Sequence, residues 1–162
     1  MNGIAATLIA TAQQVRSRTL RILQQAEPQW LTWTPAGLAN HMTWHAGHSL
    51  WVQGVLCIEP LSGESKLPAG WERRFGMETR PGLDHNPWPG RDELLSLLTA
   101  QLHDMEELLA SADPATLEIV PRGEKTNGIG WEIIHGLHDE AIHQGEMFLL
   151  LKMCRTGHAK PA

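Results

Sequence analysis

Apolar residues recur every three or four positions along four long stretches of the chain. In the first stretch, about 2–26, Ile4, Leu8 and Ala12 follow one another at steps of four. Side chains at this spacing share one face of an α-helix, because the helix makes a turn about every 3.6 residues. The stretch is therefore predicted to be an amphipathic helix that buries this face. The same periodicity predicts three further helices, over about 37–58, 91–111 and 127–155.

Prolines separate the predicted helices. Pro28, Pro60 and Pro114 each follow the end of one, and proline both lacks a backbone N–H and disfavours helix in the residue before it. Five of the ten prolines fall within 59–90, where the periodicity is weak. This segment is predicted to be a long irregular crossover between the second and third helices. No stretch alternates polar and apolar residues for long enough to predict a β-strand.

Together these elements predict an all-α fold, a four-helix bundle with a long irregular crossover between its second and third helices. The length of 162 residues fits one domain, on a prior of roughly 100–200 residues per domain, so we expect a single domain over 1–162. Helix bundles build cofactor sites from side chains on facing helices. The polar residues that point inward are therefore the candidates for chemistry.

Charge and cysteine content narrow the class of protein. Thirteen Lys and Arg against eighteen Asp and Glu give a net charge of −5 without a basic block, which argues against nucleic-acid binding. No run approaches the roughly 18 consecutive apolar residues of a membrane span, and the N-terminus lacks the basic segment of a signal peptide. Cys57 and Cys154 lie far apart in apolar surroundings, so they are predicted to be buried free thiols. We expect a cytoplasmic protein.

The chain has nine histidines and seven tryptophans but no tyrosine, so acid–base chemistry would have to use His, Asp or Glu. His41, His45 and His48 all lie in the second predicted helix. At about 100° per residue, Trp44, His48 and Trp51 share one stripe that should face the core. A lone core histidine is usually a neutral imidazole hydrogen-bonded to a carbonyl. Three histidines so close together favour a site instead.

The last predicted helix carries a row of ionisable side chains on one face. These are His135, Asp139, His143 and Glu146. Burying such groups is costly unless each is paired or neutralised, and a bound divalent cation would offset that cost. The alternative is a solvated helix face, with His138 and Glu140 also on the surface.

The second and last helices together indicate a metal site. Neighbouring helices in a bundle can bring His48 close to the i, i+4 pair Asp139 and His143. Three protein ligands with open positions form the arrangement of a catalytic metal site rather than a closed structural one. Two imidazoles and one carboxylate suit Zn, Ni or Fe(II) without selecting among them.

The chain resembles the DinB-like superfamily over essentially its whole length. That group is similar in fold to bacterial low-molecular-weight-thiol transferases, to mycothiol-dependent maleylpyruvate isomerase and to the N-terminal domain of ergothioneine-forming sulfoxide synthases. The resemblance rests on the helical architecture and on two short motifs. The motif residues are Trp44, His45, His48 and Trp51 in the second helix and His143, Gly145 and Glu146 in the last.

In that family a metal is held by one His of the second helix and an H-x-x-x-H pair of the last helix. The resemblance implies that His48 and His143 are ligands, and it puts Asp139 where the family has the first His of the pair. Aspartate is shorter, anionic and harder than histidine, so Asp139 could bind the metal directly, act through a water molecule or leave the site weak. His135 is the reserve ligand, whereas His138 is a poor co-ligand unless the helix distorts, because it lies about 140° round the helix from His143. Otherwise His135 and His138 are expected to flank the metal site, where they would support the ligands or the chemistry.

The resemblance also implies a metal-dependent enzyme with thiol-dependent S-transferase chemistry, or related hydrolase or isomerase chemistry, acting on a low-molecular-weight thiol and a small electrophile. A Lewis-acid cation would lower the pKa of a thiol or water. Glu146 would orient a ligand or move a proton, and His45 would line the entrance. Trp44 and Trp51 would form apolar walls of the pocket, with ordinary core packing as the alternative for each.

The competing hypothesis is a non-enzymatic helical module in which the inward polar cluster is a degenerate metal site. Such a protein would act by dimerisation or by binding a partner, through the leucine-rich helix 91–111 or through the crossover. For the partners we expect a homodimer, with no nucleic acid and no membrane.

Overall fold

The computed structural model describes residues 3–81, 87–118 and 128–157. These residues form helices joined by loops, and no strand occurs among them, so the all-α class is confirmed. Among these residues four helices are long, and four short helical segments lie between them. The long helices are α1 (Gly3–Gln25), α2 (Met42–Gln53), α5 (Arg91–Ser111) and α6 (Ile129–Arg155). The short ones are a 3₁₀ turn (Pro28–Trp30), a π-helical segment (Gly54–Ile58), α3 (Glu59–Ser62) and α4 (Trp71–Phe75).

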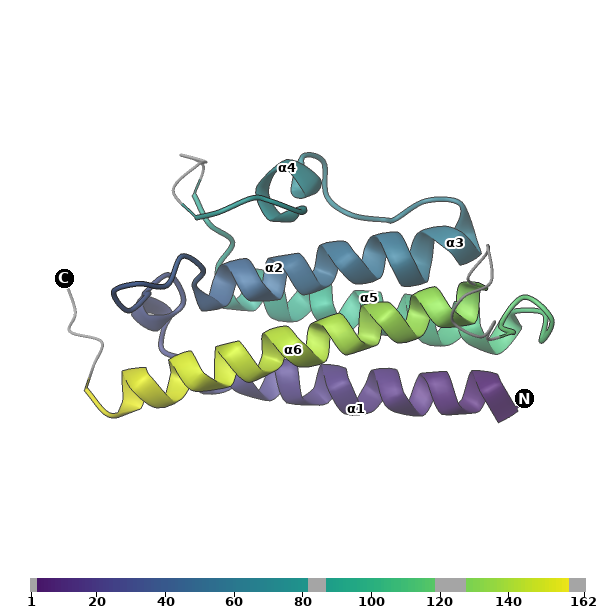
Figure 1. Ribbon diagram of the computed structural model, residues 1–162, viewed down its shortest axis with the longest axis horizontal. Coiled ribbons are helices and arrows are strands. Elements are labelled where there is room, and N and C mark those ends of the chain that lie inside the picture. The colour runs from purple at the N-terminus through teal and green to yellow at the C-terminus, as the bar shows by residue number, and fades with distance from the viewer. Residues whose placement is uncertain (1–2, 82–86, 119–127, 158–162) are drawn as a thin grey trace.

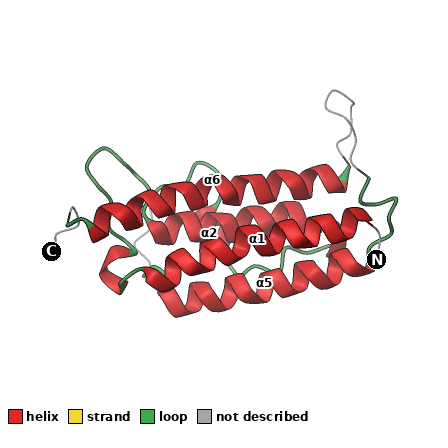
Figure 2. Ribbon diagram, turned by 90° about the horizontal axis from the view of Figure 1, so that it is seen from below, coloured by secondary structure: helices red, strands yellow, loops and turns green. Residues whose placement is uncertain are grey.

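The four long helices lie side by side (Figures 1 and 2). Helix α6 packs against both α1 and α2, and α5 packs against the same two helices. Helix α4 belongs to the predicted crossover and lies on the outer side of α2, which α4 contacts (Figure 1). Helix α2 is therefore enclosed between α4 and the other long helices. No helix within the described ranges is both long and apolar enough to cross a membrane.

The second helix differs at both ends from its predicted range of 37–58. It begins only at Met42, because His41 is extended and acts as the N-cap, with its Nδ1 accepting a hydrogen bond from the Trp44 backbone N–H at 3.0 Å. At its other end the chain runs on through a π-helical segment (Gly54–Ile58) into α3. Pro60 does not end the helix, because it occupies the first turn of α3, where no backbone N–H is needed.

Helix α2 is buried on nearly every side, and a glycine makes this possible. A Cβ on Gly47 would lie 2.3 Å from the Phe75 ring, so only glycine lets α4 pack this closely. The Trp71 indole N–H donates to the Gly47 carbonyl at 2.9 Å. The crossover therefore packs down onto α2, and the backbone at Phe75 is held close to the second half of that helix.

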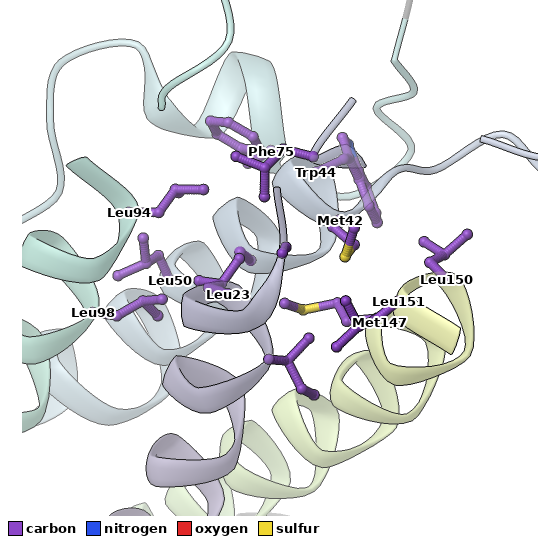
Figure 3. Close-up of a cluster of buried hydrophobic side chains, with 14 of the residues drawn as sticks. Leu23, Met42, Trp44, Leu50, Phe75, Leu94, Leu98, Met147, Leu150 and Leu151 are labelled. Atoms are coloured by element: carbon purple, nitrogen blue, oxygen red, sulfur yellow. The ribbon is translucent and has the colours of Figure 1, made fainter. Parts of the chain in front are cut away.

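The hydrophobic core is divided into two clusters by a layer of buried polar side chains. The first cluster, shown in Figure 3, joins residues of all four long helices and α4, among them Leu23, Met42, Phe75, Leu98 and Met147. The second lies toward the N-terminus of α1 and includes Leu8, Cys57, Met105, Leu109 and Ile133. Each long helix contributes a large buried polar side chain to this layer. These residues are Arg16, Gln53, Gln101 and Glu140.

Both cysteines are free and buried, as predicted. Cys154 belongs to the first cluster and Cys57 to the second, so the two thiols serve as core side chains.

Candidate metal centre

His48 of α2 is held so that one ring nitrogen is free to bind a ligand. Its Nδ1 lies 2.6 Å from the carbonyl oxygen of Phe75. A carbonyl only accepts hydrogen bonds, so Nδ1 carries the proton and Nε2 keeps its lone pair. Burial lowers the pKa of His48, and its hydrogen bond to Phe75 partly opposes that shift. A neutral imidazole whose second nitrogen donates to a backbone carbonyl is typical of metal ligands.

Asp139 and His143 stand one helical turn apart on α6 and face His48. The Oδ2 of Asp139 lies 3.5 Å from Nε2 of His143 and 3.9 Å from Nε2 of His48. One ligand atom from each of the three residues lies within 4.8 Å of the others. This Asp139 oxygen is buried and has no hydrogen-bond partner among the described residues. Donor atoms around one zinc ion lie roughly 3–4 Å apart, because each ligand bond is about 2.1 Å long.

The other nitrogen of His143 faces a second group of polar atoms. Its Nδ1 lies 2.8 Å from Nδ1 of His45 and 3.6 Å from a carboxylate oxygen of Glu146. His45 and Glu146 are themselves 3.1 Å apart. These three residues form a second set of possible ligands, and this set uses the opposite side of the His143 ring. One metal ion therefore cannot bind through both sets at once.

His45 lies inside the molecule, not at an entrance, with 3% of its surface exposed. Burial is the largest of the causes that lower its pKa to about 3, and the neighbouring His143, His41 and His48 contribute in the same direction. His45 is therefore neutral at physiological pH and can accept or donate a single hydrogen bond at each nitrogen. A His143 Nδ1–H that donates to His45 would leave the lone pair of His143 on Nε2, toward Asp139.

The two predicted pocket tryptophans lie against the His48 ring. Trp44 stacks on it with ring centroids 4.8 Å apart and planes 14° from parallel, and Trp51 lies 5.5 Å away at a tilt. The Trp44 indole N–H donates to the hydroxyl of Thr79 at 3.1 Å. Stacking and this hydrogen bond together hold the plane of the His48 ring.

The two remaining histidines of α6 are not brought to this cluster. His135 and His138 are both exposed, and neither belongs to either group of possible ligands. His138 lines a groove between α1 and α6, and it does so together with Leu8 and Ile134. The structure thus gives no support to His135 as a reserve ligand.

Sequence reasoning missed three groups that help to position the site, namely Glu140, Arg16 and the Phe75 carbonyl. Glu140 was expected on the surface in the solvated-face alternative, but it is fully buried because Arg16 of α1 pairs with it at 2.9 Å. The sequence could have indicated this pair, because Arg16 falls between Ala12 and Thr19 on the buried stripe of α1, which carries no other charged residue. The Phe75 carbonyl was also missed, because backbone atoms leave no signal in residue type.

Comparisons with known proteins agree with this architecture. A crystal structure of a conserved protein from Enterococcus faecalis superposes with a TM-score of 0.67 at 15% sequence identity, and the match covers 94% of this chain and 98% of that one. At this identity the likeness shows the fold. No curated protein matches the sequence. The model of the DinB superfamily matches residues 11–147, which is most of the chain. The chain therefore belongs to the DinB superfamily.

Proposed function

We propose that this protein is a metal-dependent enzyme that holds a divalent transition metal through His48, Asp139 and His143. One observation carries the proposal. Within the part of the chain that the structure describes, the buried Asp139 oxygen has no hydrogen-bond partner, and it lies 3.5 Å and 3.9 Å from the Nε2 atoms of two imidazoles. An unpaired buried carboxylate oxygen is costly, and a cation would offset that cost.

The donor set fits such a metal. Two imidazole nitrogens and one carboxylate oxygen suit Zn, Ni or Fe(II), and three protein ligands leave a position open for substrate. The geometry of His48 supports the same reading, because its Nδ1–H is already committed to the Phe75 carbonyl. Asp139, which departs from the family's usual His, acts in this proposal as the anionic ligand.

The chemistry we propose is thiol-dependent S-transfer between a low-molecular-weight thiol and a small electrophile. When bound, the metal supplies Lewis acidity, which lowers the pKa of a thiol. Glu146 is half-exposed on the Nδ1 side of His143, so it would take up the thiol proton through a bridging water and pass it to solvent. The sulfur then forms a bond to the electrophilic carbon, and the leaving group departs with its electron pair. Related hydrolase or isomerase chemistry would use the same residues.

The metal content of the purified protein tests whether His48, Asp139 and His143 bind a metal. Purified protein is expected to contain about one transition-metal ion per chain by elemental analysis. The double variant His48→Ala/His143→Ala should lose the metal while its circular dichroism stays helical. His135→Ala and His138→Ala are matched controls on α6, and they should keep it, because both residues are exposed and outside the cluster. Unchanged metal content in the double variant would rule out this site.

A second pair of variants separates the two possible ligand sets. If the ion binds beside Asp139, His48→Ala should abolish Zn²⁺ binding, whereas His45→Ala should weaken it only about 10- to 100-fold, as expected for a residue that hydrogen-bonds a ligand. If instead His45→Ala abolishes Zn²⁺ binding and His48→Ala only weakens it, the ion binds beside His45 and Glu146.

Enzyme activity is tested separately, with cysteine-derived thiols and a chromogenic chloronitroaromatic electrophile. Metal-loaded protein should accelerate chloride displacement, and Glu146→Gln should lower kcat because the proton acceptor is lost. Metal binding without turnover of any thiol and electrophile pair would favour the non-enzymatic module. The buried free thiols Cys57 and Cys154 fit the reducing cytoplasm that we propose as its location.

We also infer a homodimer, because α6 leaves several apolar side chains exposed. Ile142, Phe148 and Leu149 are each about half exposed, and an apolar cavity of about 540 Å³ opens between α1 and α6. Light scattering coupled to size-exclusion chromatography should give twice the chain mass. The variant Phe148→Asp should give the monomer mass, and a monomeric wild-type protein would contradict this inference.

A further inference from the structure

A single buried guanidinium joins the four long helices. Arg16 of α1 is 1% exposed. Its Nε donates to Glu140 of α6 at 2.9 Å, and its Nη1 donates to the Leu98 carbonyl of α5 at 2.7 Å. Its Nη2 donates to Gln53 of α2 at 2.7 Å. The planar fork of arginine fixes the directions of these bonds, so it also fixes where each helix can lie.

The other polar atoms of this layer are paired as well. The side-chain oxygen of Gln101 accepts from Arg16 at 3.0 Å, and its amide donates to the Leu50 carbonyl at 2.8 Å. The amide of Gln53 donates to Glu140. A network this fully satisfied leaves no group free to bind a ligand. The network therefore acts on the positions of the helices that it joins.

The layer adjoins the candidate metal centre on both helices that supply ligands. Glu140 directly follows Asp139 on α6, and Gln53 lies just over one turn beyond His48 on α2. Apolar side chains tolerate small sliding movements between helices, whereas a buried ion pair loses its hydrogen bonds if either helix shifts. The axial position of α6 against α2 sets the 3.9 Å between His48 and Asp139.

We infer that Arg16 is a positioning residue. Its network with Glu140 and Gln53 fixes the register of α6 against α2, and through this register it sets the spacing of His48 and Asp139. The ligand roles of these two residues rest on the proposed function, but the register does not. Removing the network should therefore weaken metal binding even where the protein stays folded.

The test is the triple variant Arg16→Met/Gln53→Leu/Glu140→Met, which replaces the central charged groups and their shared amide together. Removing a buried ion pair as a unit leaves no uncompensated charge, so the variant is expected to stay helical. Its Kd for Zn²⁺ should rise about 10- to 100-fold, the usual cost of losing support around a metal ligand. In metal-free protein, the ¹⁵N NMR signals of His45 and His143 should shift as their mutual hydrogen bond changes. A folded variant with wild-type Kd and wild-type histidine signals would overturn the inference.

Two further variants keep the test decisive. Leu109→Ala lies in the second core cluster, away from the site, so it should lower Tm and leave the Zn²⁺ Kd and the histidine signals unchanged. Arg16→Lys decides the question if the triple variant does not fold, because one ammonium cannot reproduce the fork toward Glu140 and Gln53. It should also raise the Kd and shift the histidine signals, and wild-type values for both would overturn the inference.

The experiment separates the two proposals. Wild-type protein that binds no Zn²⁺ would contradict the proposed function. The histidine signals of metal-free protein would then still decide whether Arg16 sets the register, since that comparison needs no metal. Signals unchanged in both Arg16 variants would overturn the positioning role whatever the wild-type affinity.

Discussion

A histidine caps the N-terminus of α2, where serine, threonine or aspartate would be usual. His41 accepts the Trp44 backbone N–H through Nδ1, and its ring packs edge-on against Trp88 at 4.7 Å between centroids. The cap works only while Nδ1 has a lone pair. Burial keeps that lone pair available, because it lowers the pKa of His41 to about 4.

This capping histidine makes stability depend on pH. The unfolded chain takes up the proton near a pKa of 6.5, whereas the folded chain resists protonation of His41 down to about pH 4. Between these values the unfolded state binds more protons, so the free energy of unfolding should fall as pH drops from 6.5 toward 4. His41 contributes roughly 3 kcal/mol at most to this loss. Urea denaturation at pH 7, 5.5 and 4.5 measures it.

The matched variant is His41→Asn, which keeps a side-chain N-cap without a titrating group. Its free energy of unfolding at pH 7 should stay close to that of the wild type, and its loss between pH 6.5 and 4 should be smaller. Part of the pH dependence should remain, because His45 and His48 also have lowered pKa values. An identical pH profile for the variant would show that His41 is not a source of the effect.

At the level of elements, α4 packs closely against α2 at one glycine, Gly47. Gly47→Ala would put a methyl group 2.3 Å from the Phe75 ring and push α4 outward. We expect a loss of about 1–3 kcal/mol in the free energy of unfolding, as for other overpacked cores. Zn²⁺ binding should weaken too, because the Phe75 carbonyl that holds His48 moves with α4.

Gly145 provides the control for this substitution. It lies inside α6, and a Cβ there would meet nothing within 4 Å. Gly145→Ala should therefore raise the free energy of unfolding by about 0.5–1 kcal/mol, through helix propensity alone. Thermal and urea denaturation should show that Gly47→Ala lowers the free energy of unfolding and that Gly145→Ala raises it, because the space around each Cβ differs. Equal destabilisation by both would contradict this account of Gly47.

Sequence periodicity predicted the long helices but not all of their ends. The ranges 91–111 and 127–155 lie close to α5 and α6, because apolar repeats and good helix formers extend over both. The predicted range 37–58 begins before the true start of α2 at Met42, and it ends before the helical chain does, at Ser62 of α3. Its true start depends on the side chain of His41, and its passage through Pro60 depends on a π-helical segment. Both are tertiary or backbone features that residue type does not report.

At the level of the whole molecule, helix periodicity identifies which side chains share a face but not how far apart two faces lie. His48, Asp139 and His143 could be grouped from their spacing, whereas their separation depends on how α2 and α6 are packed. That packing involves Arg16, which is buried in the core because it pairs with Glu140. Buried ion pairs are hard to predict because each member alone looks like a surface residue.

The metal should act on the stability of the whole fold, since its proposed ligands join α2 to α6. An ion that binds only the folded chain stabilises it by about 2.7 kcal/mol at about 100 times Kd. For a chain of this size, this corresponds to a rise in Tm of roughly 5–10 °C. Calorimetry with and without Zn²⁺ or Ni²⁺, followed by a chelator, should show the rise and its reversal. His48→Ala should lose the rise, and His138→Ala should keep it, because its side chain lies on the α1–α6 groove, away from the ligands. A Tm indifferent to metal and chelator in protein shown to be metal-free would mean that these ligands do not bind an ion.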